Sequence, residues 1–319
     1  MKKILKILKL LLISFILIGN ANAVFRNFAE TRRLFTVEGN AKLAFTSRVV
    51  QTQSGNLPQL TGLELLKNIK ESDDAIEGLT IFTDTIRKNK QTTNFLADDL
   101  ERLSRVLSMT DFPTKDIVSA LESIGRISKA AKRPGSNITQ AQVDTLMAKL
   151  TRKSSKGANA TKRLNEVKGA IAEVLILDGV IKGNFLQRFQ LIARGGIAHR
   201  DAFCKGGILE GEYFLEIKNW IKTSRSTGVG HLIDQVATHF EYYPRDITPL
   251  TKATIENDTA PGLVFQFAAH NGNLSAYRTA IEDAVRSNVR KELLNANVEL
   301  SEVEGLIDTY LKKVIVKGV

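Results

Sequence analysis

Three charged residues in the second half of the chain have the types and the spacing that hydrolytic chemistry requires. The segment YFLEIKNW at 213–220 alternates apolar residues with Glu216 and Lys218, a pattern typical of a half-buried strand. Residues two apart on a strand point to one face, so the glutamate and the lysine share a face. Asp201 precedes Glu216 by fourteen intervening residues. A hairpin of that length, with glycines at its tip, would return Glu216 beside Asp201.

Two carboxylates and one ammonium group placed together suit the hydrolysis of a phosphodiester. Paired carboxylates hold a hard divalent cation such as Mg²⁺ or Mn²⁺, which prefers oxygen ligands and keeps several waters. The cation polarises the phosphoryl oxygen and lowers the pKa of a bound water. A lysine can orient that water and offset the charge that develops at phosphorus. We therefore expect Asp201 and Glu216 to bind metal and Lys218 to position the water.

The elements that would position these residues follow one another between 162 and 270, separated by glycines and by changes of hydrophobic period. The predicted elements are a helix at 162–180, strands at 185–194, 198–204 and 212–220, a helix at 231–243 and a strand at 262–269. Two more helices follow, the second opened by a capping box of Ser301 and Glu304. The predicted fold class is mixed α/β, preceded by an all-α region.

This element order and the three charged residues resemble the PD-(D/E)XK nuclease superfamily, which has the restriction-endonuclease-like fold. Asp201, fourteen residues and then Glu216-Ile217-Lys218 match the D-x(n)-E-x-K pattern of that superfamily. The resemblance covers 162–270, about a third of the chain. It implies an α-β-β-β-α-β core with the metal site on the second and third strands.

The resemblance also adds candidate residues on two helices. Members often carry a glutamate on the first helix, where Glu173 and Glu166 lie, and we favour Glu173 as a further metal ligand. Members often carry a glutamine on the helix after the lysine strand, which here would be Gln235, supporting the site. The chain departs from the pattern at Arg200, where the pattern has a proline that many members lack. A zinc site is not favoured, because the four histidines form no HExxH motif.

The first 23 residues have the pattern of a targeting segment. MKKILKILKLLLISFILIGNANA carries four lysines before an apolar run and ends on Ala-Asn-Ala, the pattern of a bacterial secretory signal peptide. We predict cleavage after Ala23 and a secreted or periplasmic protein, with an uncleaved membrane anchor as the alternative. No later run is long enough to span a bilayer, so no transmembrane segment is expected after cleavage. The net charge would fall from +11 to +7, which fits a polyanionic partner.

The rest of the chain divides by composition. Residues 24–150 are predicted to be mainly helical, since apolar residues recur there at helical spacing. Residues 151–163, TRKSSKGANATKR, hold five basic residues and no acid and are predicted to be a basic linker. A phosphate-contacting arm and a proteolytic release site are the alternatives for this segment. The nuclease-like domain with its C-terminal helices would occupy 164–319.

These observations predict an exported metal-dependent nuclease that acts on DNA or RNA. A nuclease behind a helical region resembles bacterial toxin or effector proteins, which implies a cognate inhibitor (immunity) protein as partner. The alternative is a non-enzymatic secreted protein that binds a partner through a degenerate nuclease-like fold. In an enzyme Asp201, Glu216 and Lys218 would open into a cleft, whereas in the alternative Glu216 and Lys218 would be sealed or face bulk solvent.

Overall fold

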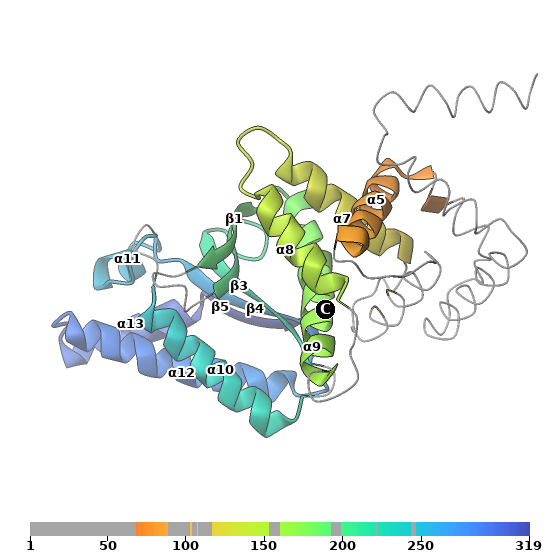
Figure 1. The fold of residues 1–319 in the computed structure, drawn as a ribbon. Coiled ribbons are helices and arrows are strands. Elements are labelled where there is room, and N and C mark those ends of the chain that lie inside the picture. The colour runs from red at the N-terminus through yellow and green to blue at the C-terminus, as the bar shows by residue number, and fades with distance from the viewer. Residues whose placement is uncertain are drawn as a thin grey trace, which may run out of the picture. The chain divides into compact units, whose positions relative to one another are not determined.

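The computed structural model describes residues 68–69, 71–88, 103, 107, 117–152, 160–192, 199–220, 223–243 and 247–319. Contacts divide the chain into two units. The first contains α5 (Asp73–Lys88) and the part of α7 (Ile117–Ala131) up to Arg126 (Figure 1). The second contains the end of α7, then α8 (Gln140–Leu150) and the elements from α9 (Ala160–Lys182) onward. The predicted signal peptide and residues 24–58 lie outside the described residues.

In the first unit, α5 and α7 pack with their backbones in contact. A Cβ on Gly78 would lie 1.8 Å from the carbonyl oxygen of Leu121, and one on Gly125 would lie 1.9 Å from that of Asp74. Only glycine allows so close an approach. An ion pair of 3.4 Å between Arg126 Nη1 and Asp74 Oδ2 joins the helices beside this crossing. None of the helices in the described part of the chain is long and apolar enough to span a bilayer.

The second unit is a mixed α/β structure, as predicted. Its sheet has five strands in the spatial order β1-β2-β3-β4-β5. The strands are β1 (Leu186–Ile192), β2 (His199–Lys205), β3 (Glu212–Asn219), β4 (Gly262–Ala269) and β5 (Val314–Gly318). The helices that follow β3 are α10 (Arg225–Glu241), α11 (Lys252–Glu256), α12 (Leu274–Asn295) and α13 (Leu300–Leu311).

The sheet combines two kinds of connection. Strands β1, β2 and β3 are antiparallel neighbours. Strands β3, β4 and β5 are parallel, so each connection between them must cross back over the sheet. Helices α10 and α11 make the first crossover, and α12 and α13 make the second. As a result β3 and β4 lie inside the sheet, and both are buried along almost their whole length.

Apolar residues cover both faces of the sheet. On one face, Leu215 and Ile217 of β3 pack with Ala172, Ile176 and Val180 of α9. The other face carries a larger core, contributed by the phenylalanines of β2, β3 and β4 and by α10, α12 and α13, which gather on one side of the strands (Figure 1). The prediction that Leu215 and Ile217 point into the core, away from Glu216 and Lys218, is confirmed.

Helix α10, helix α11 and strand β5 differ from the predicted elements, and α11 was not predicted. Helix α10 begins at Arg225, two turns before the predicted start, although Gly228 and Gly230 lower its intrinsic helix propensity. A Cβ on Gly228 would lie 2.7 Å from the Tyr277 ring, so glycine is needed where α10 meets α12. Strand β5 was not predicted. It is a five-residue strand, VIVKG, that completes the parallel edge of the sheet beside β4.

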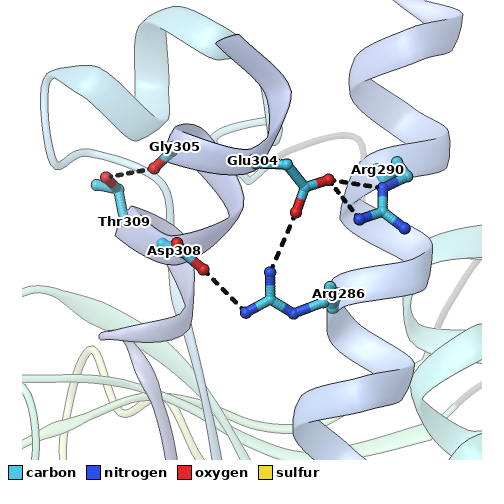
Figure 2. Close-up of polar contacts among 6 residues, drawn as sticks. All are labelled: Arg286, Arg290, Glu304, Gly305, Asp308 and Thr309. Atoms are coloured by element: carbon cyan, nitrogen blue, oxygen red, sulfur yellow. Dashed lines mark hydrogen bonds and ion pairs between the residues drawn. The ribbon is translucent and has the colours of Figure 1, made fainter. Parts of the chain in front are cut away.

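The predicted capping box of α13 is wrong. The N-cap is Glu299, and no side chain caps the helix there. Figure 2 shows what Glu304 does instead: its carboxylate accepts from the guanidinium groups of two arginines on α12. Arg286 Nη1 lies 3.3 Å from Glu304 Oε2 and its Nη2 lies 2.8 Å from Asp308 Oδ1, while Arg290 Nε lies 2.9 Å from Glu304 Oε1. We call these four charged residues the α12–α13 cluster.

Candidate active site

Strands β2 and β3 separate at the position where the sequence places Asp201 and Glu216. Their register runs from Lys205 opposite Glu212 to Ala202 opposite Leu215. The next residues in this register are Asp201 and Glu216. At this point the Asp201 Oδ2 on β2 accepts a hydrogen bond of 2.6 Å from the backbone N–H of Ile217 on β3. The aspartate is thereby fixed against the backbone of the strand that carries the glutamate and the lysine.

Glu216 and Lys218 form an ion pair inside the sheet. The Lys218 ammonium donates to Glu216 Oε2 at 3.1 Å. Their side chains are only 7% and 10% exposed, so both charges are largely removed from water. Burying a charge costs free energy unless it is paired and hydrogen-bonded, so each residue depends on the other. Asp201 is half-buried and provides the more accessible side of the group.

Burial and neighbouring charges shift the pKa values of both Asp201 and Lys218. The pKa of Asp201 is raised from its ordinary 3.8 to about 6, because burial and the nearby Glu216 carboxylate together raise it more than Lys218, the Ile217 N–H and Lys149 lower it. For Lys218, burial lowers the pKa, but the carboxylates of Glu216, Asp201 and Glu173 outweigh burial and the pKa ends above its usual value. The lysine therefore stays charged, while the aspartate holds its proton unusually tightly. Such shifts mark candidate functional groups.

Helix α9 supplies the third carboxylate. Glu173 acts electrostatically on Lys218, and its Oε1 lies 3.7 Å from the Nζ of Lys149 on α8. The end of β3 is tied to the same helix, since the Asn219 amide donates to the backbone carbonyl of Lys168 at 2.9 Å. Of the two candidate glutamates on α9, Glu173 is thus the one whose charge acts on the site lysine. We call Asp201, Glu216, Lys218, Glu173 and Lys149 the β2–β3 cluster.

Gln235 lies on α10, the helix that follows β3. His231 lies one turn before Gln235 on the same helix face. Burial and the Lys218 charge lower the pKa of His231. The Gln235 side chain is half-buried, and its Oε1 is buried with no hydrogen-bond partner among the described residues. A buried acceptor of this kind calls for a partner such as a water or a substrate group.

Trp220 is held mainly by packing. Its ring lies 5.3 Å from the Tyr277 ring, 5.6 Å from that of Phe267 and 5.7 Å from that of His231, measured between centroids. It packs against the core between the sheet and α12. These contacts account for the position of Trp220 by core packing.

The donor set fits a hard divalent cation held by few protein ligands. Within the described residues, no group of three or more His, Cys, Asp or Glu side chains is arranged to hold a metal ion. A zinc site needs three or four such ligands. Mg²⁺, by contrast, is commonly bound through one or two carboxylates together with waters and substrate phosphates. Asp201 and Glu216, opposite each other where the strands separate, provide such a pair of oxygen ligands.

A cavity of about 1050 Å³ lies elsewhere, along α10 and α12 between Arg225 and Asp283. Its lining does not include the charged residues of the β2–β3 cluster. Cavity size therefore does not identify the site, and the assignment depends on the chemistry of the residues where β2 and β3 separate.

Comparison with family models, with curated protein sequences and with solved structures finds no match to this chain.

Proposed function

We propose that this protein is a metal-dependent nuclease that hydrolyses DNA or RNA phosphodiester bonds, with its site at the β2–β3 cluster. The observation that carries the proposal is the position of Asp201. The Ile217 N–H needs an acceptor at this position, but a neutral side chain would provide one without the repulsion that the Asp201 carboxylate meets from Glu216. A site for a divalent cation does need the second carboxylate. The resemblance of these residues to the PD-(D/E)XK pattern supports the same proposal.

Each residue has a definite task in this proposal. Asp201 and Glu216 would hold Mg²⁺ or Mn²⁺. Glu173, expected from the sequence to be a further ligand, is not grouped with them as a third metal-holding side chain in the described residues and would act on the site through Lys218. When bound, the cation supplies Lewis-acid polarisation of the phosphoryl group and makes a water more acidic. The Lys218 ammonium, kept protonated by its carboxylate neighbours, would orient the attacking water and offset the negative charge that grows on phosphorus. The buried Oε1 of Gln235 would accept a hydrogen bond from that water.

The proposed biological setting is export. The N-terminal 23 residues have the pattern of a signal peptide, and the chain that would remain carries a net positive charge suited to a nucleic-acid partner. An exported nuclease of this layout would be a toxin or effector, and the producing cell would need an inhibitor protein that covers the site.

One observation favours a second candidate function. Glu216 and Lys218 are almost completely buried, as expected of a structural ion pair in a non-enzymatic, partner-binding protein. Under that proposal the cluster fixes where β2 and β3 separate and takes no part in chemistry. The two candidates differ in whether removing these charges changes a reaction or only the stability.

The test is cleavage of plasmid DNA and of total RNA by the purified chain from residue 24 onward. The reactions contain Mg²⁺, Mn²⁺ or EDTA, and Glu216→Gln and Lys218→Met are compared with the parent. The expected result is cutting of one or both polymers with either metal, none with EDTA, and a loss of at least about 100-fold in both variants.

Lys205→Ala and Glu212→Ala provide the matched control. These two residues form another lysine–glutamate pair on the same two strands, 3.9 Å apart and largely exposed. Both control variants should cut like the parent. A folded parent that cuts neither polymer with either metal would reject the nuclease and favour the partner-binding protein.

A further inference from the structure

Helix α8 is attached to the unit that carries the site, although it precedes the residues that resemble a nuclease. Its buried residues are Val143, Leu146, Met147 and Leu150. The side chain of Gln142 donates to the backbone carbonyl of Phe189 on β1 at 2.5 Å. In the loop before the helix, Asn137 donates to the carbonyl of Leu186 at 3.4 Å. These contacts fix the position of α8 relative to the sheet.

The last turn of α8 brings a lysine to the candidate site. Lys149 Nζ lies 3.7 Å from Glu173 Oε1, and its side chain is 38% exposed while that of the glutamate is 13% exposed. The lysine thus reaches from solvent to a mostly buried carboxylate. Its charge also acts beyond that contact, because it lowers the pKa of Asp201. Lys149 is the more exposed of the two lysines in the β2–β3 cluster.

We propose that Lys149 is a positioning and phosphate-contacting residue of this site. The inference rests on the proposed nuclease function and extends it to a helix outside the resembling segment. The ammonium holds the Glu173 carboxylate in place in the free protein. Lysine presents a point charge on a flexible four-carbon stem, so the same group can turn to a phosphate oxygen of a nucleic acid that enters from the solvent side. Lys218 is too deeply buried to make that contact.

This role predicts that removing Lys149 changes Mn²⁺ binding and nucleic-acid binding in opposite directions. A cation beside the carboxylates repels a divalent cation, so removing Lys149 should make Mn²⁺ bind more tightly. Removing it should also weaken nucleic-acid binding, because one phosphate contact is lost. If Lys149 merely supported the fold, its substitution would weaken both Mn²⁺ binding and nucleic-acid binding.

The experiment compares the purified parent with Lys149→Gln, which removes the charge and keeps a polar side chain, and with Lys149→Arg, which keeps the charge. Lys182→Gln is the matched control, because Lys182 pairs with Asp178 at 3.2 Å elsewhere on α9. Mn²⁺ affinity is measured by electron paramagnetic resonance of free Mn²⁺. Cleavage kinetics are measured over a series of salt concentrations.

We expect Lys149→Gln to raise KM for the nucleic acid about 10-fold with a smaller change in kcat, since a uniform binding contact is lost. The slope of log affinity against log salt concentration should become shallower by about one. Mn²⁺ should bind about five-fold more tightly. Lys149→Arg should restore KM and the salt slope, and Lys182→Gln should match the parent throughout.

The experiment distinguishes a failure of the inference about Lys149 from a failure of the proposed nuclease function. If the parent cuts and Lys149→Gln cuts with the KM and salt slope of the parent, the inference about Lys149 is wrong and the nuclease stands. The inference also fails if Lys149→Gln binds Mn²⁺ more weakly than the parent. If the parent cuts neither DNA nor RNA, the proposed function fails, and the phosphate contact of Lys149 fails with it.

Discussion

The second unit contains two clusters of charged side chains that differ in balance and in burial. The α12–α13 cluster sets two guanidinium groups against two carboxylates on the surface (Figure 2). The β2–β3 cluster sets three carboxylates against two ammonium groups, and its central pair is almost completely buried. In the surface cluster, the charges of Asp308 and Glu304 raise the pKa of Arg286, and hydrogen bonds to both carboxylates act in the same direction. In the buried cluster, the pKa of Asp201 is displaced toward neutrality.

This difference in charge balance and burial indicates that the β2–β3 cluster has a function beyond stabilising the fold. Paired charges on a surface tie two helices together at little cost and with little gain. A buried cluster with an excess of carboxylates lowers stability at neutral pH, so packing alone does not explain it. Sites that bind cations or substrates commonly keep such unfavourable groups. Substitutions in the β2–β3 cluster should therefore abolish activity and those in the α12–α13 cluster should leave it unchanged, and the effects on stability should be unequal.

The largest effect is expected from breaking the buried pair. Lys218→Met leaves Glu216 and Asp201 charged in the sheet without their ammonium partner. We expect the free energy of unfolding to fall by about 3–5 kcal/mol, because the uncompensated charge remains buried. Chemical denaturation at pH 7 measures the change.

The double variant Glu216→Gln/Lys218→Met serves as the control for that effect. It replaces both charges by neutral groups of similar size, and most of the lost stability should return. Activity should stay absent in both variants. A double variant as unstable as Lys218→Met would show that shape rather than charge holds the pair.

The next largest effect is expected from Asp201→Asn, which should raise stability by an amount that depends on pH. Because folding raises the pKa of Asp201 to about 6, the folded protein binds this proton more tightly than the unfolded chain. Its favourable contribution is fully present below pH 4 and is lost as the pH rises through 6. Asp201→Asn keeps an oxygen that can accept from the Ile217 N–H and removes the charge. It should stabilise the fold by on the order of 1–2 kcal/mol at pH 7 and should abolish cleavage.

Thermal unfolding of Asp201→Asn and the parent from pH 3.5 to 8 tests this prediction. The two curves should converge at the acid end, where the parent carboxyl is protonated, and diverge as the pH rises from about 4 to about 6. An asparagine variant that is less stable than the parent at pH 7 would mean that the aspartate charge stabilises the fold, as a structural role requires.

Breaking the α12–α13 cluster should have a small effect on stability and none on activity. Glu304→Ala removes the carboxylate that accepts from both Arg286 and Arg290. We expect the melting temperature to fall by no more than about 3 °C at low salt, since exposed ion pairs contribute little. The difference should shrink in 0.5 M salt, where screening is stronger. A fall of 10 °C, or any loss of cleavage, would remove the distinction between the two clusters.

The smallest effect is expected from Lys205→Ala on β2. Lys205 Nζ lies 3.9 Å from Glu212 Oε1, and its side chain is 61% exposed. The melting temperature should stay within about 1 °C of the parent value. A larger change would indicate that the hairpin end of β2 and β3 contributes to holding the site together.

The sequence predicted the residues of the central strands well and their surroundings less well. Alternation on β3 and the length of the hairpin were enough to place Asp201 opposite Glu216, because both follow from the two-residue period of a strand. The start of α10 was missed because local propensity disfavours glycine, whereas Gly228 is required by the approach of Tyr277. Contacts between distant segments leave no such local signal.

The same limit explains two other residues. Glu304 was predicted to cap α13, and its actual partners are arginines on α12 that local sequence cannot bring near. Lys149 was not predicted as a site residue, because it lies on a separate helix with no fixed spacing to Asp201 or Glu216. Only the packing of α8 on α9 brings it to Glu173.

The most direct test of the central claim is whether the β2–β3 cluster binds a divalent cation. Electron paramagnetic resonance can count the Mn²⁺ bound by the parent, by Asp201→Asn and by Lys205→Ala. We predict saturable binding in the parent and in Lys205→Ala, and a loss of at least about 100-fold in affinity in Asp201→Asn, where one carboxylate ligand is gone. No binding by the parent, or equal binding by all three proteins, would contradict the assignment of this cluster as the active site.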